Sequence, residues 1–314
     1  MRVAAAQARP VWFDRAATTA KVVDLIGRAA AGGVELLAFP ETFLSGYPLW
    51  IRGGTGIGFE AQEQRRAYAE YLESAVDVRG AEVREVCAAA ADHGVFVYLG
   101  ASERAVASGH GTVYCSLIAI HPRRGVVGVH RKLVPTHQER MVWGRGDGAG
   151  LRVHDAGALR VGGLNCWENW MPQARHALYA DGEEVHVATW PGWAGQTDDI
   201  SRFVALEGRV AVLSVAGLLA PDDVPDGFPL ADAMRADAAR FTFDGGSAVA
   251  GPDGRWLVAP VVGEERLVIA DIDPAEIRGA RLAADPSGHY ARPDVFAVSV
   301  DRRRREAVTF RDPG

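Results

Sequence analysis

Short apolar runs alternate with segments of helical periodicity along most of the chain. Residues 15–31 show the helical pattern, because Val22, Leu25 and Ile26 fall on one face and Gly32 follows as a common helix stop. The apolar runs have no polar face, which is typical of buried parallel strands. This pattern predicts strands at residues 2–7, 34–39, 95–100, 112–121, 126–131, 159–164, 185–189, 210–216 and 266–272. It predicts helices at residues 15–31, 59–74, 80–93, 171–181 and 197–207.

The last third of the chain is less regular. Residues 247–250 and 256–260 flank a Gly-Pro-Asp-Gly turn, which predicts a β-hairpin. Residues 219–240 are acidic and contain proline, so we interpret them as a surface loop with some helix. No Pro/Ser-rich linker interrupts the alternation, and we therefore expect one domain over residues 1–300 and a short tail over 301–314. Mixed strands with helices outside them indicate a layered α/β sandwich.

Composition narrows the possible classes of function. Apolar residues make up 48% of the chain, enough for a large buried core. No apolar run reaches the ~18 residues of a membrane span, so we expect no membrane partner. A formal net charge of −6 argues against nucleic-acid binding, and we interpret residues 302–305 (RRRR) as solvated surface. Three scattered cysteines suit a reducing compartment, and the N-terminus turns polar too early for a signal peptide, so we expect a cytoplasmic protein.

Three reactive side chains follow predicted strands. Glu41 comes after the second strand, Lys132 after the fifth and Cys166 after the sixth, and open α/β sheets usually place their chemistry at strand ends. A cysteine nucleophile attacks as the thiolate, so it needs a base or a positive neighbour. The thiol, carboxylate and ammonium together therefore predict metal-free acyl transfer. A core thiol would explain Cys166 alone, and that is how we interpret Cys87 and Cys115.

The segments around these residues resemble the nitrilase superfamily of carbon–nitrogen hydrolases. The similar segments are residues 40–48 (PETFLSGYP), 130–136 (HRKLVPT) and 164–169 (LNCWEN), in the family's order of Glu, Lys and Cys. Similarity to the true nitrilase branch lies in residues 136–140 (THQER), 143–148 (WGRGDG) and 285–294 (DPSGHYARPD). The resemblance extends from residue 3 to about residue 296.

The resemblance implies a chemistry and an architecture. Cys166 would be the nucleophile, Glu41 the general base, Lys132 the cationic stabiliser and Glu139 a second, structural glutamate, with the backbone N–H of Trp167 facing the developing charge. Such a site converts an organic nitrile to a carboxylic acid and ammonia through a thioimidate and a thioester, with no metal or cofactor. The implied fold is an α-β-β-α sandwich that pairs into an α-β-β-α-α-β-β-α dimer or a higher homo-oligomer. An amidase, a carbamoylase or a cyanide dihydratase would use the same residues, and these alternatives stay open.

Aromatic residues near the site motifs are candidates for binding a small-molecule nitrile. Tyr47 and Trp50 follow Glu41, His137 follows the Lys132 motif, and Trp190 and Trp193 lie in the loop after a predicted strand. Core packing is the alternative for the tryptophans, and a surface loop position is the alternative for His137. The aromatic content of these loops favours aromatic or arylaliphatic nitriles, but the sequence leaves the preferred nitrile open.

Overall fold

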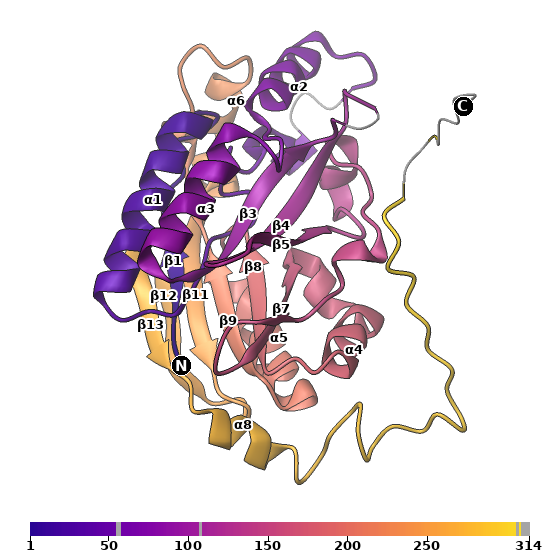
Figure 1. Cartoon of the computed structure of the whole chain (residues 1–314). Coiled ribbons are helices and arrows are strands. Elements are labelled where there is room, and N and C mark those ends of the chain that lie inside the picture. Colours follow the sequence, from indigo (N-terminus) through magenta and orange to yellow (C-terminus); the bar gives the residue numbers. More distant parts are fainter. Residues whose placement is uncertain (55–57, 107–108, 306–307, 309–314) are drawn as a thin grey trace, which may run out of the picture.

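Two β-sheets packed face to face form the centre of the molecule (Figure 1). The computed structural model describes residues 1–54, 58–106, 109–305 and 308. The first sheet has the order β13-β1-β2-β3-β4-β5, and the second has the order β10-β11-β9-β8-β7-β6, with β12 paired to β11. The first sheet contains β1 (Arg2–Gln7), β2 (Leu36–Ala38), β3 (Phe96–Arg104), β4 (Val113–His121), β5 (Gly125–Arg131) and β13 (Arg266–Asp271). The second contains β6 (His154–Asp155), β7 (Arg160–Asn165), β8 (Val185–Trp190), β9 (Ala211–Ala216), β10 (Leu218–Leu219), β11 (Phe243–Ala250) and β12 (Trp256–Val262).

Parallel pairing is confined to the middle of each sheet. β1, β2 and β3 are parallel neighbours in the first sheet, and β7, β8 and β9 are parallel neighbours in the second. Their residues are buried on both faces, which explains why these strands appear in the sequence as continuous apolar runs. One hydrophobic cluster between the sheets includes Leu36 and Phe96 from the first sheet and Val187 and Leu213 from the second.

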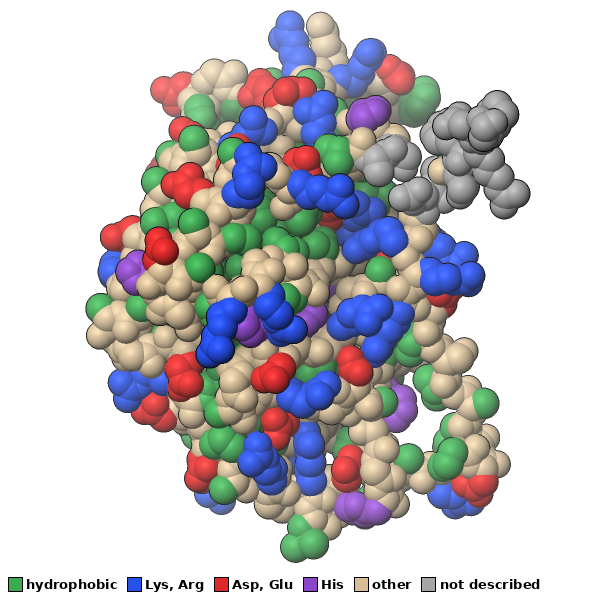
Figure 2. Space-filling view, viewed as in Figure 1, with side chains coloured by type: hydrophobic (Ala, Val, Ile, Leu, Met, Phe, Trp, Pro, Cys, Tyr) green, Lys and Arg blue, Asp and Glu red, His purple; other side chains and the backbone are tan. Residues whose placement is uncertain are grey.

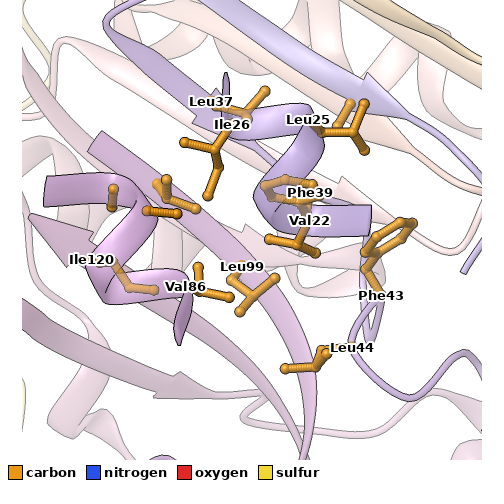
Figure 3. Packing of buried hydrophobic residues seen from close by; sticks show 14 of the residues in the cluster. Val22, Leu25, Ile26, Leu37, Phe39, Phe43, Leu44, Val86, Leu99 and Ile120 are labelled. Carbon is orange, nitrogen blue, oxygen red and sulfur yellow. The ribbon is translucent and has the colours of Figure 1, made fainter. Parts of the chain in front are cut away.

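Helices cover the outer faces of the two sheets. α1 (Arg15–Ala31) and α3 (Ala81–His93) pack on the first sheet, where Val22, Leu25 and Ile26 meet Leu37 and other strand residues (Figure 3). α4 (Pro172–Ala180) and α5 (Ala194–Gly208) cover the second sheet on the opposite side of the molecule (Figure 1). The prediction of an α-β-β-α sandwich is therefore confirmed.

Several parts of the structure depart from the predicted elements. α2 (Gln62–Ser74) begins three residues later than expected, and β6, β10 and α8 (Pro274–Ala280) were not predicted because each is short. Residues 219–240 contain η5 (Pro221–Asp223), α6 (Ala231–Arg235) and α7 (Ala238–Phe241). This segment is not simply surface, since several of its apolar side chains are buried: Leu219, Val224, Phe228, Leu230, Ala231 and Met234. Its polar composition concealed the apolar residues that face the core.

The C-terminal segment continues beyond the last helix without regular secondary structure. Residues 281–305 leave the body below α8 and return along its side, as Figures 1 and 2 show. Arg302 pairs with Asp181 at 3.1 Å, and Arg304 pairs with Asp147 at 3.1 Å. These arginines are therefore partly engaged in anchoring the segment. Residues 306–307 and 309–314 of the predicted tail, and residues 55–57 of the Gly-rich loop, lie outside the described residues. Among the described helices, none is both long and apolar enough to span a membrane.

Candidate active site

Three turns from the two sheets converge at one end of the sandwich. Glu41 follows β2, Lys132 follows β5, and Cys166 is the first residue of the 3₁₀ helix η4 (Cys166–Trp170) that follows β7. The backbone N–H of Glu41 donates to the carbonyl of Trp190 at the end of β8, at 3.3 Å, and so ties the first sheet to the second. The backbone N–H of Lys132 donates to the carbonyl of Cys115 on β4 at 2.8 Å.

Lys132 bridges two buried carboxylates. Its Nζ lies 2.8 Å from Oε1 of Glu41 and 2.7 Å from Oε2 of Glu139. One oxygen of each carboxylate and Sγ of Cys166 all lie within 4.8 Å of one another. All four side chains are buried, with Lys132 only 1% exposed. The structure thus brings together the four residues that the sequence singles out for catalysis.

The backbone at Cys166 adopts an uncommon conformation. Cys166 has a φ of 51°, a left-handed value that non-glycine residues seldom adopt and that recurs at functional sites. Asn165 and Glu168 form a capping box across this turn, which stabilises the start of η4. The neighbouring backbone N–H of Trp167 lowers the pKa of the Cys166 thiol and so favours its thiolate. The role expected of the Trp167 backbone N–H, to face the charge that develops on the substrate, stays a prediction.

Burial controls the protonation of the site. Desolvation raises the pKa of Glu41 to about 7; Lys132 opposes this effect and Glu139 adds to it. Burial also raises the pKa of the Cys166 thiol, although Lys132 lowers it. Burial alone would lower the pKa of Lys132, but the negative charges around the ammonium outweigh desolvation and raise it. Burial therefore favours the neutral Cys166 thiol, while the Glu139 and Glu41 carboxylates favour the charged form of Lys132.

Glu139 is held by several donors besides Lys132. Its Oε2 accepts from the backbone N–H of Thr136 at 2.6 Å, and its Oε1 accepts from the Tyr47 hydroxyl at 3.0 Å. It also belongs to η2 (His137–Met141), a short 3₁₀ helix that Thr136 caps. These contacts fix the Glu139 carboxylate and, through it, the Lys132 ammonium.

A cavity of about 140 Å³ opens beside Cys166. It is similar in size to a cavity of about 150 Å³ that accommodates benzene, so it fits a small organic molecule. Five residues predicted to face substrate or developing charge line it, together with further aromatic and polar residues. The predicted residues are Tyr47, His137, Trp167, Trp190 and Trp193. The further lining residues include Arg52, Thr136, Gln138, Pro191, Thr197 and Phe243.

Trp50 does not line this cavity. It is 1% exposed and packs edge-on against Tyr71 and near Phe228 in a separate aromatic cluster. The prediction that Trp50 faces substrate is therefore wrong. Its position three residues after Tyr47 suggested a shared loop, but η1 (Leu49–Gly54) turns the indole into the core.

Two contacts of the site were not predicted from the sequence. The Cys115 thiol donates to Oε1 of Glu41 at 3.3 Å, so this cysteine is buried as expected but also contacts the proposed base. Glu168 joins the turn that holds Cys166 to the turn that holds Lys132. Its carboxylate accepts from the backbone N–H groups of Asn165 and Leu133, and its Oε2 lies 3.0 Å from Nε2 of His130. The Cys-Trp-Glu-Asn motif was a sequence signal for Glu168, but its partners depend on sheet packing.

The same cluster could be considered as a metal site. Glu41, Glu139 and Cys166 each offer one ligand atom at suitable mutual distances. The Lys132 ammonium, however, already contacts both carboxylates and supplies a positive charge between them. The donor set therefore fits a lysine-stabilised thiol site better than a metal site.

Comparisons with known proteins agree with this geometry. Residues 2–282 match the family described as carbon-nitrogen hydrolase. The chain is 40% identical over 309 residues to Nitrilase 2 from an unknown prokaryotic organism, covering 98% of this chain and 94% of that protein. It is 38% identical to the aliphatic nitrilase of Rhodococcus rhodochrous, covering 98% and 84% of the two chains. The crystal structure of a carbon-nitrogen hydrolase from Helicobacter pylori G27 has the same fold, with a TM-score of 0.71, 18% identity and coverage of 94% and 96%.

Proposed function

Because the chain belongs to the carbon–nitrogen hydrolase family, and within it to the nitrilase branch, we propose that it hydrolyses an organic nitrile to a carboxylic acid and ammonia. The observation that carries this proposal is the Lys132 bridge between Glu41 and Glu139 beside the Cys166 thiol. The relatives named nitrilase, at 36–40% identity over most of the chain, favour a nitrile over an amide as the substrate.

Glu41 is proposed to start the reaction as the general base. Its Oε1 is occupied by Lys132 and Cys115, whereas its buried Oε2 has no hydrogen-bond partner among the described residues and so can accept a proton. Proton transfer from Cys166 produces the thiolate, which forms a C–S bond to the nitrile carbon. One π bond of the nitrile breaks, and its nitrogen receives the proton held by Glu41. The product is a neutral thioimidate on Cys166.

Hydrolysis then requires two water molecules. Glu41 removes a proton from the first water as its oxygen adds to the thioimidate carbon, and Glu41 returns that proton to the nitrogen. The resulting tetrahedral carbon carries one hydroxyl and one NH₂ group. Glu41 then moves the hydroxyl proton to the nitrogen, the C–N bond breaks as the C=O bond forms, ammonia leaves and a thioester remains on Cys166. The second water breaks the C–S bond, releasing the carboxylic acid and restoring the thiol. Lys132 and the Trp167 backbone N–H stabilise the negative charge that develops at each addition.

Ammonia release from matched substrates tests this proposal. Purified protein is incubated with a panel of nitriles, the amides of the same carbon skeletons, and cyanide, and ammonia, acid and amide are quantified. We expect ammonia and acid from at least one organic nitrile. Ammonia from amides alone would contradict the nitrile assignment and favour an amidase or carbamoylase, and ammonia from cyanide alone would favour a cyanide dihydratase.

We also propose that the protein works as a homo-oligomer in the cytoplasm, with residues 1–300 acting as one domain. Cys87, Cys115 and Cys166 are free thiols, which suits a reducing compartment. Phe203 and Leu206 on α5 are 49% and 42% exposed, and this outer apolar surface supports pairing through the helical layer. Light scattering of the purified protein tests the assembly, and a monomer at micromolar concentration would contradict it.

A further inference from the structure

Arg52 is a basic residue in the wall of the cavity that contains Cys166. It belongs to η1, and its guanidinium carbon lies 4.4 Å from the centre of the Phe243 ring and 5.7 Å from the centre of the Trp193 ring. Phe243 and Trp193 also line the cavity. The flat guanidinium is therefore held against aromatic side chains at the substrate site.

The Arg52 guanidinium lacks an anionic partner within the described part of the chain. Its Nη1 is buried and makes no hydrogen bond there, and no described carboxylate lies within ion-pair distance of it. Burial lowers the pKa of Arg52, and nearby Arg240 lowers it further, yet a guanidinium stays charged in proteins. Buried donors are nearly always paired in native proteins, so one that has no partner among the described residues, at a substrate cavity, fits an acceptor supplied by the substrate.

The distribution of charge along the cavity indicates at which end an anionic acceptor would bind. The catalytic end holds Glu41 and Glu139 around one ammonium, so it does not attract a second anion. Arg52 supplies a separate positive charge, and its planar fork matches a carboxylate in two hydrogen bonds. Trp190, Trp193 and Phe243 provide apolar walls for the carbon chain between the two ends.

We propose that Arg52 binds a carboxylate on the substrate, and that the preferred substrates are short cyanocarboxylic acids. This inference rests on the proposed nitrilase activity and adds the chemical class of the nitrile. The carboxylate pairs with Arg52 while the cyano group reaches Cys166. The small cavity limits the chain to a few carbons or one ring.

A matched pair of substrates tests the proposal. The pair is 4-cyanobutanoate and its methyl ester, which have the same chain but differ in charge. In the wild type, kcat/KM is expected to be higher for the acid than for the ester. Arg52→Met should lower kcat/KM for the acid by about 10- to 100-fold, mainly through KM, because it removes a charge-assisted hydrogen-bond pair that forms on binding. For the ester, kcat/KM should change by no more than about 3-fold. Arg52→Lys should retain part of the preference for the acid.

Arg240→Met is the matched control. It also removes one positive charge near Arg52, but Arg240 lies on α7, is exposed and does not line the cavity. It should leave the ratio of acid to ester turnover unchanged. If Arg52→Met lowers kcat/KM equally for the acid and the ester, or lowers it for neither, the carboxylate site is refuted while the nitrilase activity stands.

A binding measurement separates this inference from the proposed function. In a Cys166→Ala background, calorimetry with the same acid and ester reports affinity without turnover. The proposal requires tighter binding of the acid than of the ester, and loss of that difference in the Cys166→Ala/Arg52→Met double variant. Absence of the difference overturns the inference even if nitriles are hydrolysed. Its presence supports the inference even if the wild type turns over no nitrile, a result that would count against the nitrilase proposal alone.

Discussion

Replacement of Glu168 by glutamine should separate the two turns that hold the nucleophile and the lysine. The ionised carboxylate accepts backbone N–H groups from Asn165, next to Cys166, and from Leu133, next to Lys132, and it contacts His130. The charge and the hydrogen bond of His130, together with the two backbone donors, hold the pKa of Glu168 below the ordinary value despite burial, so it acts as an anion. Glutamine has one acceptor oxygen, and its NH₂ group would face at least one of the backbone donors.

The expected size of the effect follows from those contacts. Leaving one buried N–H unpaired and losing charge assistance on the other should destabilise the protein by about 2–4 kcal/mol. An unfolding entropy of about 2.1 cal/mol/K per residue over 314 residues converts this to a Tm lower by roughly 3–6 °C. A displacement of Lys132 by about 1 Å relative to Cys166 should lower kcat by roughly 100-fold.

Calorimetry and steady-state kinetics on Glu168→Gln measure both effects, and Glu184→Gln is the matched control. Glu184 is also a buried glutamate that accepts a backbone N–H, from Arg160 at 3.0 Å, but it lies away from the cavity. The control should lower Tm with little change in kcat. Equal kcat in the two variants would refute the idea that Glu168 positions the catalytic turns, even if both are destabilised.

Three further predictions address the nucleophile, the base and the packing of Gly100 against the segment that precedes the base. Cys166→Ala should abolish ammonia release while circular dichroism stays unchanged; activity within a few-fold of wild type would exclude Cys166 as the nucleophile. The value of kcat/KM should fall as pH drops through about 7, because Glu41 must be ionised to accept a proton. The raised pKa of Glu41 also stabilises the folded state below about pH 4.5, and this contribution to the free energy of unfolding is lost as pH rises through 7. Gly100→Ala should impair folding or activity, because the added Cβ would lie 1.8 Å from the Pro40 carbonyl oxygen. Gly111→Ala is the control and should behave as wild type, because its Cβ would meet no atom within 4 Å. Similar turnover in both variants would contradict this packing argument.

Local patterns in the sequence were enough to predict most of the architecture and the reactive residues. Apolar runs predict buried strands because a strand covered on both faces needs apolar side chains at every position. Glu41, Lys132 and Cys166 were recognisable because each lies in the turn directly after such a run, and chain order alone places them at strand ends. Glu139 was found through the resemblance, since nothing in its local pattern separates it from a surface glutamate.

The tertiary structure decided which segments that are distant in sequence come into contact. The Lys132 bridge depends on β2 and β5 ending at the same side of one sheet, and the approach of Cys166 depends on how the second sheet packs against it. The Cys115 contact with Glu41 and the burial of Trp50 have the same origin. Arg52 looks like a loop arginine in the sequence, and only the folded cavity gives it a partly buried guanidinium whose Nη1 has no hydrogen-bond partner among the residues that the structure describes. Sequence periodicity reports whether a position is buried, whereas the order of strands and the packing of sheets determine which groups share a low-dielectric site and how strongly they perturb one another.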